Sequence, residues 1–372
     1  MSPTIVSVHT QILDIPTIRP HKLSVSIMEH QSMVLVRIRT SDGLEGIGEA
    51  TTIGGLNYGS ESPESIKVNI DTYFTPLLMG SPADNPASLR SRINKVIKGN
   101  HFAKSAVETA LYDLLGKRLG VPVSTLLGGA VHTELPVAWT LASGDTQKDI
   151  AEARHFLETR RHDTFKLKVG LRSLKDDLKH CAAIKAALGE HISVRIDVNQ
   201  GWSECQALQA LRPLADAGID LVEQPIAEKN REGMRRLTQQ GYLPIMADES
   251  LKGPEDGLAL ARGECATVFA IKIEQAGGLR AAQDLIGIAQ AAGISLYGGT
   301  MLEGPISTIA SAHLFATIDK LEWGTELFGP LLMKDSILTE PLDYNNFTLQ
   351  VPRGPGLGIT LDEDKVRHYT RA

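Results

Sequence analysis

The hydrophobic pattern changes once along the chain, near residue 132. Before that point, residues 4–13 and 33–40 are rich in Val, Ile and Thr, the residue types that favour β-strands. Residues 62–119 then show apolar positions at helical spacing. A group of strands followed by a group of helices predicts an α+β domain in this first third of the chain.

After this point, short apolar runs alternate with amphipathic helical stretches. The candidate strands are residues 135–141, 164–169, 193–198, 221–223, 243–247, 269–273 and 295–298, with 321–327 as an eighth candidate. Regular β–α alternation predicts a parallel sheet with crossover helices, and about eight units favour a closed β/α barrel. An open doubly wound sheet is the alternative, although no G-x-G-x-x-G motif follows a first strand.

Two segments fall outside both patterns. Residues 51–60, TTIGGLNYGS, are rich in glycine and lack a helical or strand period, which predicts a mobile loop. Residues 334–372 return to short strand-like runs with Gly and Pro, and we expect this tail to pack back on the N-terminal domain.

Composition and charge narrow the class of protein. The formal net charge of −6 and the lack of a dense basic run argue against a nucleic-acid partner. No stretch reaches the ~20 apolar residues that a membrane span needs, and residues 1–20 do not resemble a signal peptide. The three cysteines are widely spaced and predict reduced, buried thiols. A cytoplasmic location without a membrane partner is therefore expected.

Three carboxylates stand at the ends of consecutive candidate strands. They are Asp197, Glu223 and Asp248, separated by 26 and 25 residues, which is one β–α unit each. Residues one unit apart at the same end of parallel strands converge on one mouth of a barrel, and active sites lie at the C-terminal mouth.

Such a group of carboxylates predicts a metal site. Buried carboxylates repel one another unless a cation neutralises them, and ligands that are all oxygen suit Mg²⁺ or Mn²⁺. A single Asp at such a position would favour an N-cap of the following helix, but three carboxylates at this spacing favour the metal. Asn199 and Glu249 are expected to orient the ligands or a water molecule.

Three lysines flank the predicted metal site. Lys166 and Lys168 are two positions apart on one strand, so both face the same side. Their mutual repulsion and partial burial are expected to lower a lysine pKa and favour a neutral amine that can accept a proton. Lys272 lies four strands further on and is expected across the mouth. A solvated Lys-x-Lys pair is the alternative for the first two, and an ion pair across the barrel for the third.

These motifs, with residues 106–129 (AVETALYDLLGKRLGVPVSTLLGG), resemble the muconate-lactonizing subgroup of the enolase superfamily over nearly the full length. The resemblance implies a (β/α)7β modified TIM barrel at residues 132–327. It also implies an α+β capping domain formed by residues 1–131 and 328–372, and a homo-oligomer, an octamer in this family. The mandelate-racemase subgroup expects a histidine on the seventh strand, which residues 296–300 lack.

Within the subgroup, residues 52–58, 139–144 and 324–330 resemble muconate cycloisomerases. This implies conversion of a small dicarboxylate, cis,cis-muconate, to muconolactone through an enediolate, in catechol catabolism by the β-ketoadipate pathway. The resemblance implies that Lys168 exchanges a proton with the α-carbon, Lys166 tunes Lys168 and holds a carboxylate, Lys272 supplies positive charge on the opposite face, and Glu326 donates to the enediolate oxygen. The substrate-binding residues it implies are Ile53, Tyr58, Thr140 and Asn199.

Other functions stay open at this stage. A chloromuconate cycloisomerase or an o-succinylbenzoate synthase of the same subgroup would fit the same motifs. Dipeptide epimerases usually carry Asp-x-Asp at the eighth strand, where this chain has Glu326, which could also make only a structural hydrogen bond. Tyr58 could be an ordinary packed aromatic residue. A non-catalytic ligand-binding relative would not need lysines on both faces of the site.

Overall fold

The computed structural model describes residues 2–22 and 27–371. The N-terminal part forms an antiparallel sheet of three strands in the order β1 (Ile5–Lys22), β2 (Ile27–Thr40) and β3 (Glu45–Thr51). β1 is longer than the pattern predicts, because it lies at the sheet edge and an edge strand tolerates prolines. The register between β1 and β2 shifts after Pro16, where the proline interrupts the ladder.

Helices follow this sheet, as predicted. They are α1 (Pro63–Asn69), the π-helical turn η1 (Ile70–Phe74), α2 (Thr75–Leu78), α3 (Pro86–Val96), α4 (His101–Leu119) and α5 (Val123–Leu126). α4 packs closely across β3, and glycine permits the approach: a Cβ at Gly48 would lie 1.9 Å from the Ala106 carbonyl oxygen. This contact fixes the sheet and α4 as one cap.

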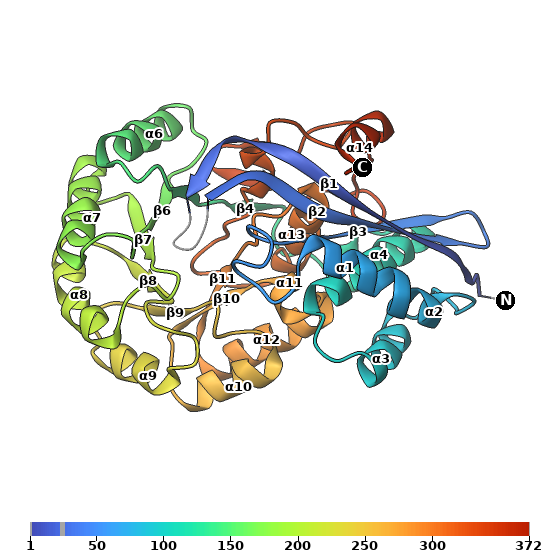
Figure 1. Ribbon diagram of the computed structural model, residues 1–372, viewed down its shortest axis with the longest axis horizontal. Helices are drawn as coiled ribbons and strands as arrows, with labels where there is room; N and C mark the ends of the chain where they lie inside the picture. The colour runs from blue at the N-terminus through green and yellow to red at the C-terminus, as the bar shows by residue number, and fades with distance from the viewer. Residues whose placement is uncertain (1, 23–26, 372) are drawn as a thin grey trace.

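The barrel occupies the middle of the chain (Figure 1). Its seven parallel strands are β5 (Trp139–Leu141), β6 (Thr164–Lys168), β7 (Ser193–Asp197), β8 (Leu221–Glu223), β9 (Ile245–Ala247), β10 (Val268–Ile271) and β11 (Ser295–Gly298). The helices between and after them are α6 (Thr146–Glu158), α7 (Leu174–Leu188), α8 (Glu204–Asp216), α9 (Arg231–Gln239), α10 (Pro254–Arg262), α11 (Ile273–Ala276), α12 (Leu279–Ala292) and α13 (Pro305–Phe315). In Figure 1, α6–α10 form an outer arc around the strands.

The expected eighth strand, residues 321–327, is reduced to a single bridging residue. Thr325 pairs in parallel with Gly298 at the end of β11 and with Val137 just before β5. The Glu326 amide donates to the Gly298 carbonyl at 2.8 Å, and the Ala138 amide donates to Thr325 at 2.8 Å. The ring is thus closed at this point, and the predicted barrel with its α+β cap is confirmed.

The C-terminal tail touches both parts of the molecule. After η2 (Gly329–Leu332), β12 (Tyr344–Asn345) and β13 (Thr348–Gln350) form a small sheet with β4 (Glu134–Pro136), just before the first barrel strand. α14 (Glu363–Tyr369) lies against β1 of the cap, where the Arg371 amide donates to the Ile12 carbonyl at 2.8 Å. The domain boundaries at residues 131/132 and 327/328 stay a prediction.

Two smaller expectations have clear outcomes. Cys181 and Cys265 are buried free thiols, as expected, but Cys205 is exposed, because it lies in the first turn of α8 on the side that faces away from the barrel core. Within residues 2–22 and 27–371, no helix has both the length and the apolar character that crossing a bilayer requires.

Glu49 joins the cap to the barrel. It lies on β3, is fully buried, and accepts a 2.7 Å hydrogen bond from the Thr51 hydroxyl. Its carboxylate also accepts from the backbone amides of Gly304, Ile306 and Ser307 at the start of α13. Burial, opposed by these donors, raises the pKa of Glu49 to about 7.

The raised pKa of Glu49 predicts a pH-dependent stability. The Glu49 carboxyl holds its proton more tightly in the folded state than in the unfolded chain. The protonated carboxyl therefore contributes its full stabilisation below about pH 4.5, and this contribution is lost as the pH rises through about 7. The loss is on the order of 3 kcal/mol. Glu49→Gln, which is neutral throughout, should show a smaller fall in the free energy of unfolding over this range, measured by urea denaturation.

The exposed Glu340→Gln variant is the control for this measurement. Its stability should fall with pH as steeply as that of the unaltered protein. Parallel curves for all three proteins would show that Glu49 does not carry the dependence.

Candidate active site

A small cavity lies at the C-terminal mouth of the barrel, beneath the glycine-rich loop. Its volume is about 20 Å³. It is lined by Ile53, Tyr58, Thr140, Lys166, Lys168, Asp197, Asn199, Glu223, Asp248, Lys272, Thr300, Leu302 and Glu326. The eleven side chains predicted from the sequence as catalytic, substrate-binding or metal-binding are all among them.

The three carboxylates stand where strands end. Asp197 and Glu223 are the last residues of β7 and β8 and are paired in register, and Asp248 follows directly after β9. Each is 1% exposed. The one-unit spacing therefore does bring them to one mouth.

Gln224, the residue after Glu223, connects the end of β8 to the loop that carries Asp248. Its side-chain oxygen accepts from the Asp248 amide at 3.1 Å and from the Ser250 hydroxyl at 2.9 Å. Its side-chain nitrogen donates to the Ile226 carbonyl at 3.0 Å. Gln224 thus fixes the loop after β9, and with it the direction of the Asp248 side chain.

Lys166 and Lys168 both point into the mouth and share one carboxylate. Lys168 Nζ donates to Asp197 Oδ2 at 2.6 Å and to Asn199 Oδ1 at 2.9 Å. Lys166 Nζ donates to Glu223 Oε2 at 2.9 Å and lies 3.6 Å from Asp197 Oδ2. Lys166 is buried, whereas the Lys168 side chain keeps 15% of its exposure. Lys168 is therefore the more accessible of the two ammonium groups.

Lys272 approaches the carboxylates from the other side. It is the first residue after β10, four strands along the sheet from β6, and its Nζ lies 2.6 Å from Asp248 Oδ1. Lys272 Nζ also donates to the Tyr58 hydroxyl at 3.0 Å, and that hydroxyl donates to Asp248. Tyr58 is thus bound to the site rather than only packed in the cap.

Glu326 closes the ring of polar groups. Its Oε1 accepts from the Thr140 hydroxyl at 2.5 Å, and its Oε2 forms an ion pair with Lys166. Glu326 directly follows Thr325, which pairs with the neighbouring strand segments, and this position directs the Glu326 side chain into the mouth of the barrel.

The expected lowering of a lysine pKa is wrong for Lys166. Burial lowers the pKa of Lys166, but the carboxylates of Glu223 and Glu326 outweigh this effect and raise it well above its ordinary value. Although burial raises the pKa of Asp197, Lys168 and Lys166 bring it down to about 2. The repulsion between the two lysines is thus outweighed by the acids that surround them, which the spacing of the lysines does not reveal.

The oxygen ligands in this region fit a divalent cation. Five buried acidic side chains, Asp197, Glu223, Asp248, Glu249 and Glu326, lie here with the side chains of three lysines. Within residues 2–22 and 27–371, Oδ1 of Asp248 and Oε2 of Glu249 are buried without a hydrogen-bond partner, although the former contacts Lys272. Burial together with the neighbouring Asp248 and Asp197 raises the pKa of Glu249 to about 8.

The carboxylates do not yet converge on one point. Among the described residues, no three carboxylate, imidazole or thiol groups are already spaced to surround a metal ion. The contacts give the reason, because a lysine ammonium group lies against each of the three carboxylates. The donor set suits the ion, and the lysines would have to withdraw from these oxygens.

Two lining residues were not identified from the sequence, Thr300 and Leu302. Both follow β11, close to the segment 296–300 that lacks a histidine. Leu302 has a φ of 58° and its amide donates to the Thr300 hydroxyl at 2.8 Å, while Glu303 accepts from the Met301 amide at 2.8 Å. Hydrophobic periodicity carries no information on such a loop; the polar Thr300 at a strand end was the signal available.

Family models and relatives agree with this geometry. Residues 148–365 match the enolase C-terminal domain-like family, and residues 7–128 match the N-terminal domain of the mandelate racemase and muconate lactonizing enzyme family. A protein of Acinetobacter lwoffii named muconate cycloisomerase 1-2 is 58% identical, over 99% of this chain and 95% of its own. A chloromuconate cycloisomerase of Pseudomonas sp. strain P51 is 44% identical, over 99% of both chains.

A solved structure extends the likeness to three dimensions. The muconate lactonizing enzyme of Pseudomonas fluorescens, solved with muconolactone, is 56% identical, covers all of both chains and superposes with a TM-score of 0.99. Enzymes of the superfamily depend on a divalent metal ion, which the donor set found here suits. The chain therefore belongs to the mandelate racemase and muconate lactonizing enzyme family of the enolase superfamily.

Proposed function

We propose that this protein is a muconate cycloisomerase, which converts cis,cis-muconate to muconolactone and uses Mg²⁺ or Mn²⁺. One observation carries the proposal: a single cavity holds three strand-end carboxylates with lysine ammonium groups on both sides of them. Relatives named muconate cycloisomerase are 58% identical to this chain, against 44% for those named chloromuconate cycloisomerase, which favours the unsubstituted substrate.

The reaction needs one C–O bond and one C–H bond to form. One substrate carboxylate oxygen adds to the carbon β to the other carboxylate, and the electron pair of the double bond moves onto that carboxylate as an enediolate. The Lys168 ammonium group then gives its proton to the α-carbon, and solvent restores the proton to the lysine. The product thus carries one proton more than the dianionic substrate. Lys168 suits this role because its side chain is the more exposed of the pair.

The other polar groups hold charge. Lys166, buried between Glu223 and Glu326, stays protonated and places a fixed positive charge beside Lys168. Lys272 supplies positive charge on the opposite side. Asp197, Glu223 and Asp248 would hold the divalent ion, which supplies a positive charge that stabilises the enediolate oxygens. Glu326, which forms an ion pair with Lys166 here, is the remaining polar group that would contact the same oxygens.

Substrate binding requires the site to open. A volume of about 20 Å³ holds one or two water molecules, not a six-carbon dicarboxylate. Ile53 and Tyr58, on the glycine-rich loop, and Thr140 and Asn199, on the barrel, are the groups that would contact the substrate. We expect the loop to move away and then close over the bound substrate to exclude water. The homo-oligomer and the cytoplasmic location stay predictions.

A substrate panel tests the proposal. The purified protein is assayed with cis,cis-muconate, chloromuconates and dipeptides, with Mg²⁺ or Mn²⁺ present. Loss of the diene absorbance of muconate, at a kcat/KM above that for chloromuconates, is the expected result. Epimerisation of a dipeptide without consumption of muconate would instead place the protein among the epimerases. Product formed in D₂O should carry one deuterium at the α-carbon, and its configuration identifies the face that is protonated.

A further inference from the structure

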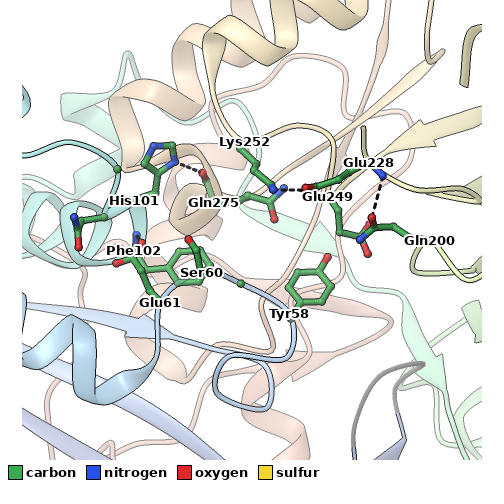
Figure 2. A pocket seen from close by; sticks show the side chains of 13 residues that line it. Tyr58, Ser60, Glu61, His101, Phe102, Gln200, Glu228, Glu249, Lys252 and Gln275 are labelled. Atoms are coloured by element: carbon green, nitrogen blue, oxygen red, sulfur yellow. Dashed lines mark hydrogen bonds and ion pairs between the residues drawn. The ribbon is translucent and has the colours of Figure 1, made fainter. Parts of the chain in front are cut away.

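A second, larger cavity lies beside the candidate active site, between the cap and the barrel (Figure 2). Its volume is about 300 Å³. The cap contributes residues of two segments, 58–61 and 99–102, and the barrel contributes Gln200, Glu228, Glu249, Lys252 and Gln275. We call it the outer cavity, and the 20 Å³ cavity the inner one.

The wall between the two cavities is built on Asp248. Tyr58 lines both cavities, and its hydroxyl donates to the Asp248 carboxylate. Gln275 Nε2 donates to the Asp248 backbone carbonyl at 2.6 Å, and Glu249 is the next residue along the chain. Tyr58 thus lies between the outer cavity and one of the predicted metal ligands.

The charge of the outer cavity selects what can pass through it. Three acidic side chains, those of Glu61, Glu228 and Glu249, line it together with the ammonium group of Lys252 and the imidazole of His101. When ionised, these acids attract a divalent cation and repel a dianionic substrate. Its oxygens are also the ligand type that Mg²⁺ and Mn²⁺ prefer.

One of these acidic side chains, Glu249, has a carboxyl oxygen without a hydrogen-bond partner among the described residues. Glu61 accepts from the Phe102 and Ala103 amides at the start of α4, and Glu228 pairs with Lys252 at 2.5 Å (Figure 2). Glu249 is 4% exposed, and within the part of the chain that the structure describes its Oε2 has no hydrogen-bond partner. A buried carboxylate oxygen without a donor is costly, and a cation in transit would satisfy it.

We propose that the outer cavity is the route by which the divalent cation reaches the inner site, with Glu249 as its transfer point and Tyr58 as the gate. The inference rests on the proposed metal site at Asp197, Glu223 and Asp248. In this structure, the Tyr58 hydroxyl donates a hydrogen bond to the Asp248 carboxylate, and Lys272 forms an ion pair with the same carboxylate. Movement of Tyr58 exposes Asp248 to the cation held by Glu249, and the ion then passes inward.

The Lys252–Glu228 pair provides a matched test. Glu228→Gln and Lys252→Gln each break the same ion pair but change the charge of the wall in opposite directions. Neither residue lines the inner cavity. The association rate constant of Mn²⁺ is measured by rapid mixing of metal-free protein with Mn²⁺ and a fluorescent indicator of free Mn²⁺. At low salt, we expect Glu228→Gln to lower the rate constant about threefold and Lys252→Gln to raise it by a similar factor.

The outcomes separate this inference from the proposed metal site. The metal site itself is tested by Mn²⁺ binding at equilibrium, which the unaltered protein should show and the Asp197→Asn variant should lose. If the unaltered protein does not bind Mn²⁺, the proposed metal site and the proposed route are both wrong. If Mn²⁺ binds but the two variants change its association rate in the same direction, or leave it equal to that of the exposed control Glu158→Gln, the route is wrong and the site stands. Tyr58→Phe, which removes the hydrogen bond to Asp248, should raise both the association and the dissociation rate constants.

Discussion

Lys168→Ala is expected to lower the kcat for muconate by about 10²- to 10⁴-fold, the usual contribution of a general acid or base. Lys168 contacts the site through Asp197 and Asn199 and is partly exposed, so its loss removes the proton donor without opening the core. The variant keeps all three carboxylates that would hold the ion, and Mn²⁺ binding should therefore stay near normal. Steady-state kinetics, with circular dichroism and Mn²⁺ titration of the same sample, measure all three properties.

The matched control is Lys175→Ala, an exposed lysine on α7. It should retain full turnover. If Lys168→Ala also keeps near-normal turnover, the proton donor has been assigned to the wrong residue, and Lys272 on the opposite side becomes the candidate. The configuration of the deuterated product made in D₂O then decides between the two, because the lysines face opposite sides of the substrate.

The strand-end residues could be predicted because the barrel repeats. Each β–α unit adds about the same number of residues, so Asp197, Glu223 and Asp248 had to share one mouth once the strands were assigned. The same logic placed Lys166 and Lys168 inward, since alternate residues of a strand share a face. The periodic pattern of the sequence therefore predicts the location of those side chains that helices and strands position.

The parts that could not be predicted depend on loops and on summed charge. Leu302 enters the cavity through a left-handed backbone held by Thr300, and the cap residue Gln31 donates to its carbonyl. No local pattern encodes a contact between residues about 270 positions apart. The pKa of Lys166 likewise depends on Glu326, which the Thr325 bridge brings next to it although the two lie 160 residues apart. The eighth strand was overestimated because residues 321–327 lie mainly in a loop and pair with neighbouring strands only through Thr325.

Removal of divalent cations with a chelator is expected to abolish lactonisation. Without the ion, the ammonium groups remain against the carboxylates that would bind it, so Lys168 is held by Asp197 and Lys272 by Asp248. Neither lysine is then free to act on the substrate, and nothing offsets the enediolate charge. Turnover should return when Mg²⁺ or Mn²⁺ is added in excess, measured by the muconate absorbance.

The same titration should raise thermal stability, because a ligand that binds only the folded state stabilises it by about 2.7 kcal/mol at one hundred times its Kd. Chelator already saturated with Mg²⁺ is the control and should leave turnover unchanged. Unchanged turnover in free chelator would remove the metal from the reaction. A loss of turnover without a metal-dependent rise in Tm would point to an ion held by the substrate rather than by Asp197, Glu223 and Asp248.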